Sequence, residues 1–231
     1  MRKINPTSVR DDFRSQLTDL TTFHNTCLVA FTNGTDKSTL TERTLLAAAV
    51  AWEGFVSDMF IAYINTDATR FKQHLEDSFD THLKGSSTPQ KVFEKYGSIT
   101  FPKHLSKADV LELADSLGNN ITFSKFALLE KKAGTWLIAT HADKFKTLNG
   151  RQKAVVNSII ALRNHIAHRS DRSLTAMNAL LNENALTPTG IKRGNKNFHN
   201  VGAWLKAVPV GRQQTRFAII MQILDGIAAT F

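Results

Sequence analysis

Apolar residues recur at intervals of three and four along most of the chain, the period of an α-helix with one buried face. The first such stripe covers Val9–Phe31, and Asn33-Gly34 then interrupts it. A second stripe extends to about Ile64, and Thr39-Leu-Thr-Glu42 resembles a capping box at its start. Because the connection between the stripes is short, we expect two helices that form an antiparallel hairpin.

The middle of the chain is less regular. A helix is expected over Asp67–Leu83, followed by a polar loop at 84–89. The segment Ser106–Asp109 resembles another N-terminal box, and the helix it opens is expected to reach about Leu117. The short apolar segment 135–139 fits either a strand or the edge of a buried helix, and its periodicity leaves both open.

Helical patterns return in the C-terminal part. One strong stripe follows Gly150 and continues to His168, and a further helix is expected from Ser170 to Leu181. Residues 187–200 are rich in Gly, Asn and Lys, which predicts an exposed basic loop. The pattern as a whole predicts an all-α helical bundle with additional peripheral helices, built as a single domain over residues 1–231, with core helices at about 8–31, 39–64, 151–168 and 212–229.

Composition narrows the class of protein. The 42% apolar content and the mean hydropathy of −0.20 are typical of a soluble globular protein. The basic N-terminus is not followed by the apolar run of a secretory signal, and apolar stretches such as Phe217–Leu224 are shorter than a membrane span needs. The single cysteine, Cys27, excludes an internal disulfide framework and suggests a buried thiol. We therefore expect a cytoplasmic protein with no membrane contact.

The net charge of +9 is unevenly distributed. Residues 1–133 hold 16 Lys/Arg and 16 Asp/Glu, whereas residues 134–231 hold 13 Lys/Arg and only four acids. The windows 144–170 and 184–224 contain no acid and six Lys/Arg each. Such an asymmetry favours a polyanionic partner, because neutralising phosphates releases condensed counterions, although a solvated basic face gives the same pattern.

The most informative segment is Ile160–Arg169, which closes an apolar helix. Arg163 offers a permanently charged planar fork suited to phosphate oxygens, and His168 has a side chain that exchanges protons near neutral pH. Five residues on a helix correspond to about 140° of rotation, so the two side chains do not lie on one face. They can still converge, because arginine is long and the helix is expected to end at Arg169–Ser170. RNA carries its own nucleophile, the 2′-hydroxyl, so these groups suit RNA cleavage without a cofactor.

The pattern Arg163-Asn164-x-x-x-His168, together with Trp52-Glu53 in the middle of an Ala-rich aromatic helix, resembles the signature of the HEPN superfamily, and in particular its RiboL-PSP-HEPN branch. The resemblance implies an all-α HEPN-like fold and a metal-independent endoribonuclease. It implies that Arg163 binds the scissile phosphate, that His168 acts as general acid or base, and that Asn164 orients the site. Members pair so that two such helices form a composite site, and they serve as toxins or antiviral effectors with a neutralising partner.

Each residue also has a structural interpretation. His165 forms a His-x-x-His pair with His168, but without a third ligand we predict no metal, and we expect a helix-face residue or an auxiliary RNA contact. Glu53, in apolar surroundings, is expected to pair with Arg163 or a neighbouring helix. We predict backbone-phosphate contacts for the cationic side chains near the site and in the basic loop, Arg169, Lys192, Arg193 and Lys196.

Three functions are therefore compatible with the sequence. The favoured one is the endoribonuclease. The second is a non-catalytic HEPN-type module that binds RNA, a nucleotide or a partner protein. The third is a helical scaffold, which predicts neither salt-sensitive RNA binding nor toxicity on expression.

Overall fold

The computed structural model describes residues 3–83, 87–115, 117–118 and 120–231. Every regular element within these ranges is a helix, which confirms the predicted all-α class. The elements are α1 (Pro6–Ala30), α2 (Gly34–Thr66), α3 (Thr69–Leu83), α4 (Thr88–Tyr96), α5 (Lys107–Ala114), α6 (Phe126–Trp136), α7 (Ala139–Lys146), α8 (Gly150–His168), α9 (Asp171–Leu180), the 3₁₀ helix η1 (Asn184–Thr189), α10 (Val201–Lys206) and α11 (Arg216–Ala228).

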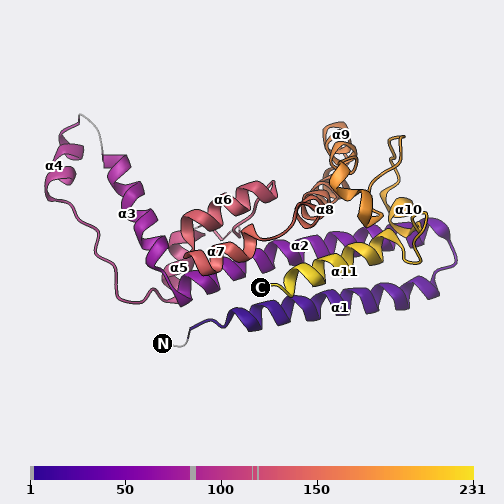
Figure 1. Cartoon of the computed structure of the whole chain (residues 1–231), viewed down its shortest axis with the longest axis horizontal. Helices are drawn as coiled ribbons and strands as arrows, with labels where there is room; N and C mark the ends of the chain where they lie inside the picture. The colour runs from indigo at the N-terminus through magenta and orange to yellow at the C-terminus, as the bar shows by residue number, and fades with distance from the viewer. Residues whose placement is uncertain (1–2, 84–86, 116, 119) are drawn as a thin grey trace.

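Helices α1 and α2 form the predicted antiparallel hairpin, and α11 packs along it (Figure 1). The start of α2 differs from the prediction. Asn33 is its N-cap and accepts a hydrogen bond from the Thr35 amide at 2.8 Å, so the helix begins five residues before Thr39. Helix α1 has already ended at Ala30, so the Asn-Gly pair opens α2 rather than ending α1, and Glu42 is free for a tertiary contact.

The core gathers around α2. Its buried face includes Trp52, Phe55 and Phe60, and the Phe55 ring stacks on Phe13 of α1 with centroids 4.5 Å apart. By length and composition α2 could cross a membrane, but 61% of its most apolar window is buried within the protein. Long helices at the centre of a globular core have this character.

Helix α1 buries a narrower face than its sequence pattern suggests. Phe23 is 58% exposed and Cys27 is half-buried, so the prediction of a buried thiol was wrong. The buried position between them is taken by His24, which lies 3.0 Å from the Thr41 hydroxyl (Nε2 to Oγ1). A polar side chain fills a place in the helix interface because a hydroxyl on α2 satisfies it.

Helices α3 and α4 project from one end of the hairpin, opposite the end that carries α8, α9 and α10 (Figure 1). The polar loop predicted at 84–89 is shorter than expected, because Ser87 caps α4 and Pro89 occupies its first turn. Residues 84–86 lie outside the described part of the chain. The Ser106–Asp109 capping box is confirmed, but α5 ends at Ala114.

The 135–139 segment contains the end of α6, the start of α7 and the connection between them. Trp136 is the last residue of α6, Leu137 is its C-cap, and Ile138 is the N-cap of α7. The segment is extended over only these two residues. Its apolar side chains fill the corner between the helices, since Trp136 and Leu137 are both buried.

In the C-terminal part, α8, α9 and α11 lie within about four residues of their predicted bounds. Thr215 rather than a residue near Arg212 caps α11. The predicted loop 187–200 is only partly exposed: its first residues belong to η1, and Ile191 is buried. Helix α10 was not predicted because six residues are too few for a periodic signal.

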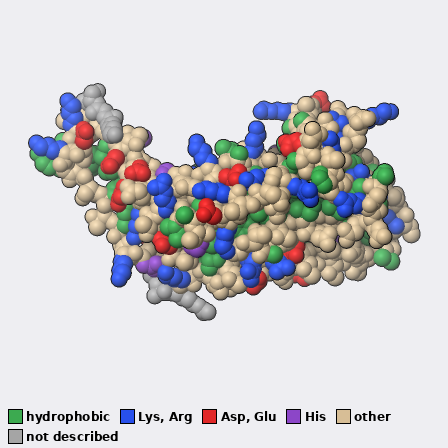
Figure 2. Space-filling view, in the orientation of Figure 1, with side chains coloured by type: hydrophobic (Ala, Val, Ile, Leu, Met, Phe, Trp, Pro, Cys, Tyr) green, Lys and Arg blue, Asp and Glu red, His purple; other side chains and the backbone are tan. Residues whose placement is uncertain are grey.

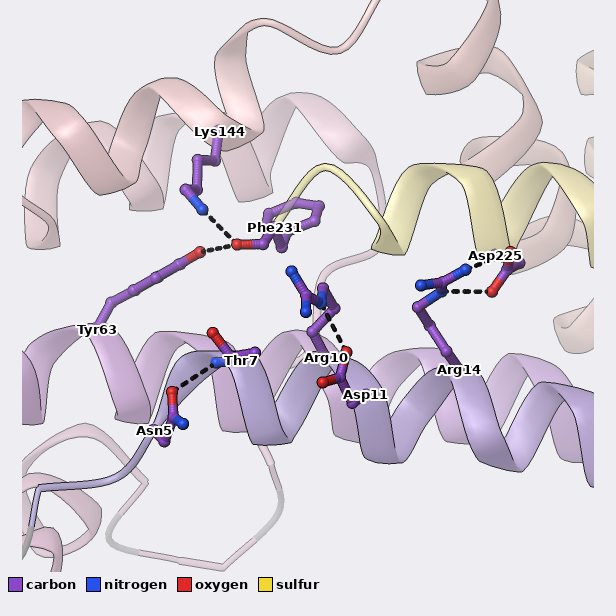
Figure 3. A network of polar contacts seen from close by, with 9 residues as sticks. All are labelled: Asn5, Thr7, Arg10, Asp11, Arg14, Tyr63, Lys144, Asp225 and Phe231. Carbon is purple, nitrogen blue, oxygen red and sulfur yellow. Dashed lines mark hydrogen bonds and ion pairs between the residues drawn. The ribbon is translucent and has the colours of Figure 1, made fainter.

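Polar contacts join the far end of α11 to the hairpin (Figure 3). The Arg14 guanidinium of α1 binds Asp225 of α11, with Nε 2.7 Å from a carboxylate oxygen. The Phe231 carbonyl accepts hydrogen bonds from Lys144 of α7 and from the Tyr63 hydroxyl of α2. These contacts fix α11 against α1, α2 and α7.

Helix α10 approaches α2 closely at Gly202, and a substitution there tests this contact. A Cβ atom at this position would lie 2.2 Å from the Ser38 carbonyl oxygen, so Gly202→Ala is expected to destabilise the protein by about 1–3 kcal/mol. The matched control is Gly226→Ala in α11, where nothing lies within 4 Å, and it should stabilise the helix by about 0.5–1 kcal/mol. Urea unfolding measures both. Equal effects would contradict the close approach.

Candidate functional site

The candidate site lies on α8, and the residues that begin this helix form a strong N-terminal cap. Asn149 and Gln152 form a reciprocal capping box at Gly150. One face of the helix then buries apolar side chains such as Val155, Ile159 and Leu162. This packing fixes the rotation of α8 and turns Arg163 toward α2.

Arg163 and Glu53 form a half-buried ion pair between α8 and α2. The Arg163 Nη2 donates to a Glu53 carboxylate oxygen at 3.2 Å, and the two side chains are 30% and 20% exposed. Arg163 Nη1 also donates to the Asn164 side-chain oxygen at 3.0 Å. The contact predicted between Glu53 and Arg163 is therefore present. The guanidinium therefore has a fixed direction, and its Nε is buried without a hydrogen-bond partner among the described residues.

His168 is the last residue of α8 and is exposed. The helix ends there because Arg169 adopts the left-handed conformation, with φ of 50°, and its amide donates to the His165 carbonyl at 2.8 Å. The expected end of the helix is thus observed. Within the described contacts, no hydrogen bond joins Arg163 to His168. The structure brings together Arg163, Asn164 and Glu53, with His168 five residues further along α8 and about 140° around it.

His165 is buried between α8 and α9. Its Nδ1 lies 3.0 Å from the Ser173 hydroxyl, and Ser173 in turn completes the capping box that Ser170 opens on α9. Burial lowers the pKa of the His165 imidazole, and the positive charge of Arg169 lowers it further. These contacts give His165 a structural place at the α8–α9 turn, in addition to any auxiliary role in binding RNA.

Sequence reasoning missed the contacts of Glu42. This buried carboxylate of α2 accepts hydrogen bonds from the Arg169 guanidinium and from the Gly202 amide of α10, the latter at 2.8 Å. It therefore joins three elements beside His168. The sequence carries no signal for these contacts, because Glu42 lies in the polar first part of α2, beside Arg43, where an acid fits a helix cap.

The cationic residues of the basic segment 187–200 differ in accessibility. Lys196 is exposed, and Lys192 is half-buried with its Nζ 2.7 Å from the Asn184 side-chain oxygen. Arg193 donates from Nε to the Asn178 carbonyl at 2.6 Å and from Nη1 to the Gly194 carbonyl at 2.9 Å. Its guanidinium thus holds the segment against α9. Figure 2 shows Lys and Arg side chains projecting from the lobe that contains α9.

The fold and this constellation define an all-α protein of HEPN type. The model of the RiboL-PSP-HEPN family matches residues 11–197, which include Glu53 and the whole of α8. The chain belongs to the RiboL-PSP-HEPN family, as its resemblance predicted. No curated protein and no solved structure matches the chain significantly.

The pKa values of the buried histidines determine how the free energy of unfolding should depend on pH. Burial lowers the pKa of His24 and His165 below the ordinary value of 6.5, so the folded protein protonates both imidazoles less readily than the unfolded chain does. Below that value the unfolded chain binds more protons than the folded protein, and the free energy of unfolding falls as the pH falls. Urea midpoints should therefore decrease from pH 7.5 to pH 5.5, and His24→Gln should flatten the decrease. A constant midpoint in the wild type would contradict this.

Proposed function

We propose that the protein is a metal-independent endoribonuclease of HEPN type. The observation that carries the proposal is the Arg163 guanidinium, which Glu53 and Asn164 orient five residues before the exposed His168 at the end of the same helix. Both residues lie in the region that the family model matches. The acid-free windows around α8 and the basic segment 187–200 add the positive field that an RNA substrate requires.

In this mechanism Arg163 binds the scissile phosphate and stabilises the charge that develops on its oxygens. His168 transfers a proton, either from the attacking 2′-hydroxyl or to the leaving 5′-oxygen. Glu53 and Asn164 act as positioning residues, because they fix the direction of the guanidinium before substrate arrives. The RNA supplies the nucleophile, so the reaction needs no cofactor.

One imidazole supplies only one of the two proton transfers. A two-fold dimer that places two α8 helices side by side would bring a second His168 into a composite site, because a symmetric interface repeats each residue. We include this homodimer in the proposal, with RNA as the polymer partner. The cations Lys192, Lys196, Arg169 and Arg193 are proposed to contact phosphates, with the smallest share from Arg193, whose donors are already engaged.

For the biological setting we propose a cytoplasmic toxin or antiviral effector with an antitoxin or other regulatory partner. Such an enzyme slows growth when it is expressed alone. Expression of the wild type should therefore reduce growth, and His168→Ala should restore it. Normal growth with active, soluble wild-type protein would contradict the toxin assignment.

A non-catalytic HEPN-type module is the second candidate, favoured by one observation: Arg163 is already engaged by Glu53, and no described contact links it to His168. Incubation of the purified protein with labelled RNA in excess chelator separates the two candidates. The proposal predicts cleavage that continues in chelator. Intact RNA with salt-sensitive binding would instead establish the module.

A further inference from the structure

An open groove of about 360 Å³ lies at the end of α8 that carries His168. One wall is the first turns of α2, with the exposed hydroxyls of Thr35 and Thr39, and the other is formed by His199 and Asn200, which precede α10. Arg169, the residue after His168, lines the groove as well. Its volume falls within the range of about 300–1,000 Å³ in which proteins bind small organic groups.

The charges in the groove cancel. Arg169 is the cation that lines it, and its guanidinium is bound by the buried carboxylate of Glu42. What remains available is polar: two hydroxyls, the side-chain NH2 group of Asn200 and the His199 imidazole. A phosphate needs uncompensated positive charge, whereas a nucleobase needs neutral donors, neutral acceptors and a ring on which to stack. The chemistry of the groove therefore fits a base better than a phosphate.

The walls of the groove are held in place before any ligand binds. Glu42 ties Arg169 to the Gly202 amide, and the Asn200 side-chain oxygen caps α10 by accepting from the Ala203 amide at 2.8 Å. Gly202 packs directly on the backbone of Ser38 in the opposite wall. A preformed site loses little free energy to ordering when it binds, so even a single base can be held with useful selectivity.

We propose that this groove is a nucleobase subsite, which holds a base of the RNA strand next to the scissile bond. The position of the subsite next to a scissile bond rests on the proposed function, whereas the binding of a base does not. Arg169 follows His168 directly at the end of α8, so the groove adjoins the residue to which the proposed mechanism gives the proton transfer. The subsite would give the enzyme a base preference at one position beside the cut.

The first experiment needs no catalysis. The wild-type chain is titrated with each of the four ribonucleosides, and with inorganic phosphate, while NMR signals of Thr39 and His199 are followed. At least one nucleoside should shift these signals saturably and phosphate should not. In Thr39→Leu, which places an apolar branch in the groove, affinity should fall by about tenfold, as the loss of one or two hydrogen bonds predicts. Thr140→Leu, at an exposed threonine of α7 outside the groove, is the matched control.

The second experiment maps cleavage sites on a random-sequence RNA pool. The wild type should show a base preference at one position beside the cut, and Thr39→Leu and His199→Ala should flatten it by about tenfold, with the preference kept in Thr140→Leu. Cleavage with an unchanged preference in both groove variants would overturn the subsite and leave the nuclease standing. Intact RNA together with saturable nucleoside binding would overturn the nuclease and leave the subsite standing. No response to any nucleoside, or a response to phosphate alone, would overturn the subsite.

Discussion

Replacing His168 with alanine is expected to lower the rate of RNA cleavage by about a thousandfold, the middle of the range for loss of a general acid or base. The melting temperature should not change, because the side chain is exposed at the end of α8 and surface replacements alter stability by about 0.5 kcal/mol or less. His82→Ala, at an exposed histidine in the last turn of α3, is the matched control and should retain full activity. Equal activity of the two variants would remove His168 from the site.

Arg163→Ala should reduce cleavage to a similar extent but with a different effect on stability. From the sequence we would expect no loss of stability for either variant, on the view that both groups are exposed. The structure changes this expectation for Arg163, since its removal leaves Glu53, only 20% exposed, without the ion pair. We expect a loss of about 1 kcal/mol. Arg172→Ala on the exposed face of α9 controls for the loss of one positive charge.

The second large effect is expected at Glu42. Glu42→Ala removes the acceptor of the buried Gly202 amide and the partner of Arg169 at the same time. A buried donor without an acceptor costs about 1–3 kcal/mol, and the lost ion pair adds to it, so we expect about 3 kcal/mol in total. For a chain of 231 residues this corresponds to a fall in melting temperature of roughly 6–12 °C.

Two variants give this prediction its control. Glu112→Ala replaces an exposed glutamate of α5 and should leave the melting temperature unchanged. Glu42→Gln keeps an oxygen for the Gly202 amide but loses the charge, so its effect should be intermediate. If Glu42→Ala has the same melting temperature as the wild type, Glu42 does not join α2, α10 and the α8–α9 turn in solution.

The sequence predicted the long helices because each buries a periodic apolar face, and that signal is local. The stripe from Val155 to Leu162 predicts α8 and the face that it buries. The Arg163–Glu53 contact was also within reach, since an acid amid apolar residues of α2 requires a partner. The family resemblance supplied the chemistry of Arg163, Asn164 and His168, which periodicity alone does not.

What the sequence did not predict depends on contacts between distant segments. Glu42 looks like a helix cap until α10, 160 positions further along, supplies an amide for its carboxylate. Arg193 looks like a phosphate ligand until α9 supplies a carbonyl for its guanidinium. The burial of His24 could not be predicted from the sequence, because its polar partner, the Thr41 hydroxyl, lies on another helix.

The chemistry of the RNA ends tests the central proposal most directly. Attack by the 2′-hydroxyl produces a 2′,3′-cyclic phosphate on one fragment and a 5′-hydroxyl on the other, without a metal ion. Mass spectrometry of the fragments formed by the wild type in excess chelator should find these ends, and His168→Ala should form almost none. Fragments with 3′-hydroxyl and 5′-phosphate ends, formed only when magnesium is added, would contradict the proposed function.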